Sequence, residues 1–432
     1  MKLSLDSAEI ERISAPLRAA NAAFATRYPG ERPDRQPVHT IYGGAHLFRA
    51  DAAPRLGQLA LQALEEHAPD AATLAEAFAL EPRLAEKVRP RVLHKLRTEP
   101  VEDLRIDFED GYGVRPDVEE DGHAGSCARE VARGHAEGLL PPFIGLRIKS
   151  LTEDTRKRAL RTLDLFLTAM LEGTRGALPS GFVITLPKLQ IPEHAAALAD
   201  ALDVLEPRLG LSCGALRFEI MIEQTQAVLD ATGRVAVPAL VDAARGRCVA
   251  AHLGTYDYTA SSGVTAAHQH MGHPACEFAK HCMQASLGGT GVWLSDGATN
   301  VMPVGDRATV HAAWRLQASN VHHSLVGGFY QGWDLHPAQL VARFTAVYAF
   351  YLEALPAATA RLSAFVGKAA QATLVGDVFD DAATGQGLLN FFLRGLGCGA
   401  IAEGEALATG LTLDELHSRS FLKILAGRRA GR

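Results

Sequence analysis

The chain contains 432 residues, of which 47% are hydrophobic and 21% are charged, and this ordinary globular composition excludes a disordered protein. The 43 basic and 49 acidic residues give a net charge of −6 without a basic cluster, so we expect no nucleic-acid partner. No apolar run reaches 18 residues and the N-terminus turns acidic early, so we expect a cytoplasmic protein without a membrane partner.

The first 36 residues predict a helical arm. Asp6 is followed three residues later by Glu9, which is the pattern of a capping box at a helix start. Apolar residues then recur at helical spacing, at Ile10, Ile13 and Leu17. Prolines between residues 33 and 37 end this pattern, so we expect the arm to cover residues 1–36.

Eight short apolar runs, alternating with helical stretches, begin after the arm. They cover residues 38–48, 104–110, 143–150, 182–188, 216–223, 249–257, 290–295 and 324–333. A strand-helix order repeated in this way favours a closed parallel sheet, so we predict a (β/α)₈ TIM barrel over residues 37–355. A helical insertion is expected at about 68–100. Residues 356–432 show no strand signal and predict a C-terminal helical domain.

Three of these runs alternate apolar and charged residues. The charged sides contain Arg105, Asp107 and Glu109 in one run, Arg147 and Lys149 in the next, and Arg217, Glu219 and Glu223 in the third. Because the apolar side of a barrel strand meets the surrounding helices, we expect the charged sides to face the lumen. A charge buried there is costly unless it is paired, binds metal or contacts a substrate.

The ends of the predicted strands collect the residues that could carry chemistry, because active sites of such barrels lie at the C-terminal mouth. They are Glu109, Asp110, Arg147, Lys149, Lys188, Glu223, Asp257 and His336. Carboxylates from different strands suit Mg²⁺ (or Mn²⁺), which prefers oxygen ligands and keeps open positions. An arginine beside such a metal can bind the carboxylate of a 2-oxo acid.

Five strand-end motifs resemble those of a known superfamily. They are DFED at 107–110, LPK at 186–188, MIEQT at 221–225, GTYDY at 254–258 and GFYQGWDLHPAQ at 328–339. In this order they resemble the motifs of the HpcH/HpaI aldolase, citrate lyase β-subunit and malate synthase superfamily. The resemblance runs over residues 38–345 and implies a TIM barrel of the phosphoenolpyruvate/pyruvate type.

The resemblance also implies roles for individual residues. Glu223 and Asp257 match the metal-binding glutamate and aspartate, and Arg147 matches the arginine that binds the substrate carboxylate. Glu109 matches the acid that supports this site. Residues 380–384 resemble a motif of the malate synthase C-terminal domain, which would make Asp381 the base that takes a proton from acetyl-CoA.

Lys149, Lys188 and His336 complete the candidates for substrate binding, and structural alternatives stay open. Glu223 could pair with a lumenal arginine, and Asp257 or Asp381 could cap a helix. Lys188 could instead form a Schiff base, which requires a depressed pKa. A further group, His268, His270 and His273, invites a zinc site but lacks the helical spacing of zinc proteases.

The function that the resemblance implies is a Mg²⁺-dependent carbon-carbon lyase or aldolase. Its substrate would be a 2-oxo acid or an acyl-CoA thioester, cleaved through a metal-stabilised enolate. Condensation of an acyl-CoA with a 2-oxo acid, as in malate synthase, is one alternative, and a non-catalytic metabolite-binding barrel is another. The small-molecule substrate is the expected partner, and a homo-oligomer stays open.

Overall fold

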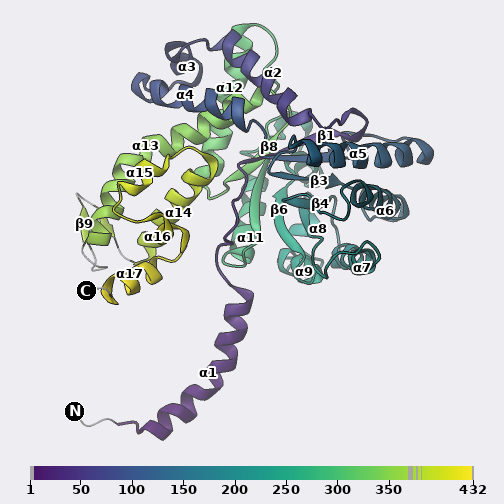
Figure 1. The fold of residues 1–432 in the computed structure, drawn as a ribbon. Helices are drawn as coiled ribbons and strands as arrows, with labels where there is room; N and C mark the ends of the chain where they lie inside the picture. Colours follow the sequence, from purple (N-terminus) through teal and green to yellow (C-terminus); the bar gives the residue numbers. More distant parts are fainter. Residues whose placement is uncertain (1–3, 368–372, 376–377, 381, 431–432) are drawn as a thin grey trace.

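The computed structural model describes residues 4–367, 373–375, 378–380 and 382–430. Helix α1 (Ser7–Arg27) extends away from the body of the molecule, as Figure 1 shows. The expected capping box is present, because the Glu9 N–H donates to the Asp6 carboxylate and the Asp6 N–H donates to the Glu9 carboxylate. The chain then enters the barrel through residues 28–38.

Eight parallel strands pair in sequence order, and the last pairs with the first, so that the barrel is closed. They are β1 (His39–Gly44), β2 (Asp103–Asp107), β3 (Phe143–Arg147), β4 (Phe182–Leu186), β5 (Phe218–Ile222), β6 (Cys248–Leu253), β7 (Trp293–Ala298) and β8 (Gln331–Asp334). The predicted (β/α)₈ TIM barrel is therefore confirmed.

Helices surround the barrel on its outer side (Figure 1). After β1 the chain forms η1 (Ala45–Leu47), α2 (Ala52–His67), α3 (Ala71–Phe78) and α4 (Pro82–Thr98), the last two within the expected insertion. The later connections contain α5 (Asp117–Glu137), α6 (Arg156–Gly173), α7 (Pro192–Arg208), α8 (Thr225–Val228), α9 (Val237–Ala243), α10 (Thr255–Ser261), η2 (Ala266–His268), α11 (Pro274–Leu287) and α12 (Arg307–Val326).

Several predicted strands have wrong boundaries; the run at 38–48, for example, is a strand only as far as Gly44 and continues as η1. The apolar run at 324–333 starts in the last turn of α12 and becomes a strand only at Gln331. The run at 249–257 leaves the sheet after Leu253, so Asp257 lies in the first turn of α10 rather than on a strand. Short apolar runs occur in buried helices and strands alike, so their composition does not fix where one ends.

The C-terminal segment begins with α13 (Gln339–Gly367), which crosses residue 356 without a break. It continues with β9 (Thr373–Val375), β10 (Val378–Asp380), α14 (Ala382–Cys398), α15 (Glu403–Leu407), α16 (Leu413–His417) and α17 (Phe421–Ala430). The antiparallel pair of β9 and β10 shows that the expected absence of strands was wrong. These strands are three residues each, too short to give a periodic signal.

This C-terminal segment lies beside the N-terminal end of the barrel. A cavity there is lined by Trp293, the first residue of β7, and by Tyr330, which precedes β8. Asn390 and Arg394 of α14 line the same cavity, and Arg394 stacks 3.9 Å from the ring centre of Tyr330. The opposite end of the barrel, where the strands finish, carries the candidate site.

On the N-terminal side of the candidate site, the lumen is filled by charged side chains that form hydrogen bonds and ion pairs with one another. Arg105 is almost wholly buried and bonds to Asp103 and, at 3.0 Å, to both carboxylate oxygens of Glu219. His252 lies 3.0 Å from the same glutamate and accepts a bond from the Trp333 indole. This network fills the lumen between the N-terminal end of the barrel and the site.

Within the described part of the chain, no helix combines the length and apolar character that a membrane span requires.

Candidate active site

Glu223 and Asp257 line one cavity at the C-terminal mouth of the barrel. The cavity has a volume of about 370 Å³. Glu223 directly follows β5, and Asp257 follows β6 by one turn of helix α10. Lys188, which follows β4, connects them: its backbone N–H donates to Glu223, and its Nζ lies 4.0 Å from an Asp257 oxygen. The two carboxylates therefore lie on the same rim.

A neighbouring glycine makes room for the Glu223 side chain. Gly254 separates β6 from α10, and a Cβ at this position would lie only 2.5 Å from Glu223 Cβ and 2.6 Å from its Oε2. Real Cβ atoms do not approach other atoms so closely. The absence of a side chain at residue 254 thus allows a buried carboxylate to stand beside the start of α10.

The ionisation of Glu223 is opposed by its surroundings. The residue is buried, and burial together with the Asp257 carboxylate raises the pKa of Glu223 to about 8. A divalent cation between the two groups would offset both effects. Two carboxylates beside an open cavity also match the few protein ligands that Mg²⁺ usually takes, so the residues present fit this ion.

Arg147 ends β3 and is held in place by Asp107, its neighbour in register on β2. Its Nε and Nη2 lie 2.7 and 2.5 Å from the two Asp107 oxygens, a two-pronged ion pair. The guanidinium stacks 4.7 Å from the ring centre of Tyr42, and its Nη1 lies 3.3 Å from Glu109. Arg147 and Asp107 both line the cavity.

Lys188 is an anchored cation. Its Nζ donates to Glu109 and, at 2.8 Å, to Asp110. Although burial opposes its charge, these carboxylates hold the pKa of Lys188 well above its usual value. A Schiff-base lysine needs the opposite shift, so this alternative is disfavoured. Its backbone φ of +50° is strained for a non-glycine residue, a feature that clusters at functional sites.

The other predicted site residues lie outside the cavity lining or outside the described residues. Lys149 Nζ donates to the Phe108 carbonyl at 2.6 Å and lies 3.2 Å from Glu120, so it faces α5. The Nδ1 of His336 accepts a bond of 3.2 Å from the Ala338 N–H, where α13 is about to begin. Asp381 lies outside the described residues. The functional roles of these three residues stay predictions.

Several residues that line the cavity were missed at the sequence level. Tyr42 and Thr255 each have a buried hydroxyl without a hydrogen-bond partner in the described part of the chain. Such groups are costly unless water or a ligand satisfies them. Trp333 and Tyr256 complete much of the wall. Alternation along β1 could have indicated Tyr42, which is paired in register with lumenal Arg105.

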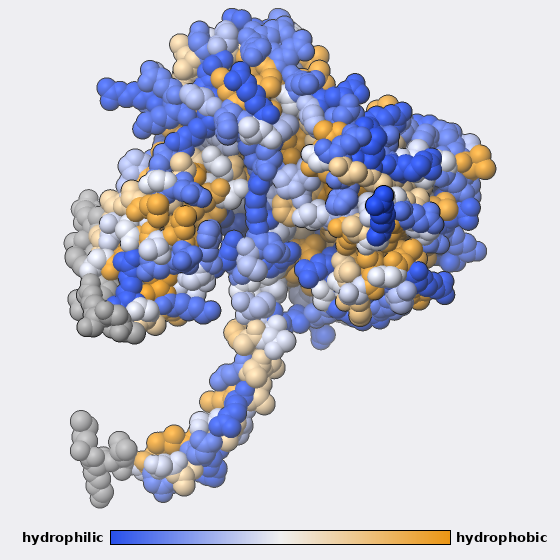
Figure 2. All heavy atoms as spheres, viewed as in Figure 1, coloured by the Kyte–Doolittle hydropathy of each residue, from blue (hydrophilic) through white to orange (hydrophobic). Residues whose placement is uncertain are grey.

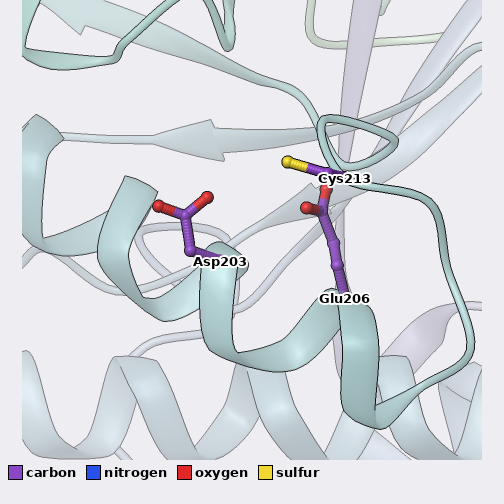
Figure 3. Close-up of side chains that lie close together, drawn as sticks. All are labelled: Asp203, Glu206 and Cys213. Carbon is purple, nitrogen blue, oxygen red and sulfur yellow. The ribbon is translucent and has the colours of Figure 1, made fainter.

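A second group of possible metal ligands lies away from the cavity. Figure 3 shows Asp203 and Glu206 of α7 close to Cys213, which follows the helix in a loop. Arg247 donates to both carboxylates, at 2.5 and 2.7 Å, and the Leu216 N–H also donates to Glu206 at 2.8 Å. These bonds already use the carboxylates, so the group stabilises the fold.

The zinc alternative gains no support from the described residues, because the three histidines at 268–273 do not form such a group of close ligands. His273 instead caps α11, since its Nδ1 accepts a bond of 3.1 Å from the Ala275 N–H.

Fold and site together define a closed parallel α/β barrel with acids, an arginine and a lysine at its C-terminal mouth. A family model matches residues 17–424, and the chain belongs to this family, which is described as Domain of unknown function (DUF6986). No curated protein matches the sequence.

Solved structures of other proteins are similar to this chain over most of its length. A citrate lyase from Burkholderia xenovorans LB400 aligns with a TM-score of 0.58 and 19% identity, over 88% of this chain and 98% of that one. A malate synthase from Haloferax volcanii aligns with a TM-score of 0.47 and 17% identity, over 74% and 76% of the two chains. The first similarity shows that this chain shares the fold of the citrate lyase.

Proposed function

We propose that the protein is a divalent-metal-dependent lyase or aldolase that cleaves a carbon-carbon bond of a 2-oxo acid or an acyl-CoA thioester. The observation that carries this proposal is the meeting of Glu223, Asp257 and Arg147 around one cavity. A barrel that only bound a neutral metabolite would not need two neighbouring carboxylates in its cavity. The fold shared with a citrate lyase agrees with this choice.

Each residue of the site has a defined task in this proposal. Mg²⁺ (or Mn²⁺), held by Glu223 and Asp257, would polarise the carbonyl oxygen of the substrate and stabilise the negative charge that develops there. Arg147, fixed by Asp107, would bind the substrate carboxylate. Lys188 would hold Glu109 and Asp110 in position.

Proton movement is assigned to Asp110. Among the cavity-lining carboxylates, Asp107 is committed to Arg147, while Glu223 and Asp257 are the proposed metal ligands. Asp110 is half exposed, and although burial opposes its charge, hydrogen bonds with Glu109 and Lys188 lower the pKa of Asp110, so it is ionised and able to accept a proton. It is therefore placed to accept the proton of a substrate hydroxyl as the carbon-carbon bond breaks, and to return that proton to the enolate carbon of the released product.

The geometry favours cleavage over the malate-synthase alternative. The resemblance to malate synthase implies a base from the C-terminal segment, which would have to reach the mouth. However, α13 begins just after β8 and, with 29 residues, is about 43 Å long. The described helix α14 then lies at the N-terminal end of the barrel, where Asn390 and Arg394 line a cavity with Trp293.

A substrate screen tests the proposed function. Hydroxyacyl-CoA thioesters and hydroxy-2-oxo acids would be incubated with the protein and Mg²⁺ or Mn²⁺, and products identified by mass spectrometry. We expect metal-dependent cleavage that Glu223→Gln abolishes and that Asp203→Asn, a change in the structural acidic group, leaves intact. The absence of metal-dependent turnover and of metal-dependent ligand binding would favour a non-catalytic barrel.

The synthase alternative has its own assay. The protein would be incubated with acetyl-CoA and glyoxylate, and free thiol would be measured. Thiol release that is lost in Asp381→Asn would support the synthase, whereas cleavage activity that survives this substitution would support the lyase.

A further inference from the structure

Helix α1 presents an uncovered apolar stripe. None of the residues of this helix is buried. The four large apolar side chains of the stripe are 47–64% exposed, and they are Ile10, Ile13, Leu17 and Phe24. Figure 1 shows the helix extending from the body, and Figure 2 shows apolar residues at its surface. The body of the same chain therefore does not cover this stripe.

Two features make this helix depend on packing against another surface. It contains 21 residues, is about 31 Å long, and has Pro16 in its interior, which removes one backbone hydrogen bond. Most of the stability of helices in proteins comes from packing of an apolar face rather than from intrinsic propensity. The arm thus needs a partner surface along its length.

The apolar residues of the stripe are spaced so that two copies of this helix can pair with each other. Ile10 and Phe24 lie seven residues before and after Leu17, and Ile13 lies within the same pattern. This seven-residue repeat is the pattern of paired helices. Two antiparallel copies that cross at Leu17 would place Ile10 of each arm beside Phe24 of the other, as a two-fold symmetric contact requires.

The charges of the arm favour the same arrangement. Residues 6–16 contain three acids (Asp6, Glu9 and Glu11) and Arg12, a net charge of −2, whereas residues 17–27 contain Arg18 and Arg27, a net charge of +2. Antiparallel pairing opposes these halves, while parallel pairing would align like charges. Within one chain, Arg18 contacts Glu11 at 3.4 Å and Arg27 contacts Asp242 at 2.9 Å, both at exposed positions.

We propose that α1 is a dimerisation arm that pairs, antiparallel, with α1 of a second copy of this chain. Its base is tied to the barrel by the Arg27–Asp242 ion pair and by a 2.8 Å bond from the Gly30 N–H to the Gly289 carbonyl. The paired arms link two bodies without contacting the cavity at the strand ends. The proposal does not depend on the catalytic function.

Measurement of molar mass tests the pairing. Light scattering after size exclusion is expected to give the mass of two chains at micromolar concentration for the wild type, and of one chain for Leu17→Glu. Ala22→Glu is the matched control, because residue 22 lies across the helix from residue 17 and should leave the dimer intact. A monomeric wild type, or a dimer that survives Leu17→Glu, would overturn the proposal.

Disulfide crosslinking tests the direction of the pair, in a background where exposed Cys213 is replaced by serine. Under an added oxidant, Leu17→Cys is expected to crosslink to itself across the two-fold axis. Ile10→Cys and Phe24→Cys should each fail to crosslink alone and should crosslink when mixed. Self-crosslinking of all three variants would show parallel helices and contradict the antiparallel arrangement.

Discussion

The Glu223 carboxylate is buried beside that of Asp257, and its pKa of about 8 means that the metal-free protein holds a proton there at neutral pH. A divalent ion can bind fully only after that proton leaves, because metals bind the deprotonated carboxylate. Proton release and metal binding should therefore be linked through this residue.

This linkage predicts a pH dependence with a definite sign. One proton displaced per ion makes Mg²⁺ affinity fall about tenfold per pH unit below pH 8. The pKa of Glu223 in the folded protein is raised above its ordinary value of 4.5. In the metal-free protein, the contribution of Glu223 to the free energy of unfolding should therefore decrease as the pH rises from 4.5 through 8. Thermal unfolding of the wild type and Glu223→Gln, with and without Mg²⁺, isolates this contribution.

The role of Arg147 should depend on the position of its guanidinium group as well as on its charge. The substitution Arg147→Lys keeps the positive charge but removes the two-pronged contact with Asp107. We expect kcat/KM to decrease about 10 to 10²-fold, which corresponds to the loss of a charge-assisted bond at the reacting molecule. Arg217→Lys, at an exposed arginine near the other end of the barrel, should behave as the wild type in steady-state kinetics.

At the scale of the elements, the alternation of apolar and charged residues predicted the direction of side chains inside the strands. It did not predict the direction of side chains beyond the strand ends. Arg105, Asp107 and Arg147 all face the lumen as expected, because they lie on regular strand. Lys149 lies beyond the end of β3, where the two-residue period no longer holds, and it turns toward α5. Its position depends on a contact with Glu120 that no local pattern contains.

The connection between β6 and α10 was also beyond the reach of local sequence patterns. The motif at 254–258 indicated the metal-binding role of Asp257, but the position of this residue in a helical turn depends on where β6 ends. Close packing of Gly254 against Glu223 joins segments 31 residues apart, and only the closed barrel brings them together.

Gly254→Ala tests this packing. The added methyl group would press on the Glu223 side chain, so we expect metal affinity to decrease about 10 to 100-fold, as for other changes that misplace ligands. Gly122→Ala is the matched control, because a Cβ at this position in α5 meets no atom within 4 Å. Calorimetric titration compares them, and equal metal affinity in both variants would refute the packing argument.

At the scale of the whole molecule, the barrel separates two ends with different properties. The buried network around Arg105 and Glu219 fills the lumen between them. Proposed chemistry is thereby confined to the mouth where the strands finish, and the C-terminal helices occupy the other end. Dimerisation through the arm would leave that mouth free for a substrate.

Titration of Mn²⁺ or Mg²⁺ into the protein tests the central claim most directly. Isothermal calorimetry should show one divalent ion per chain for the wild type and no such binding for Glu223→Gln or Asp257→Asn. Circular dichroism of the variants would establish that they are folded. Binding of one ion that persists unchanged in both folded variants would contradict the assignment of Glu223 and Asp257 as the metal ligands.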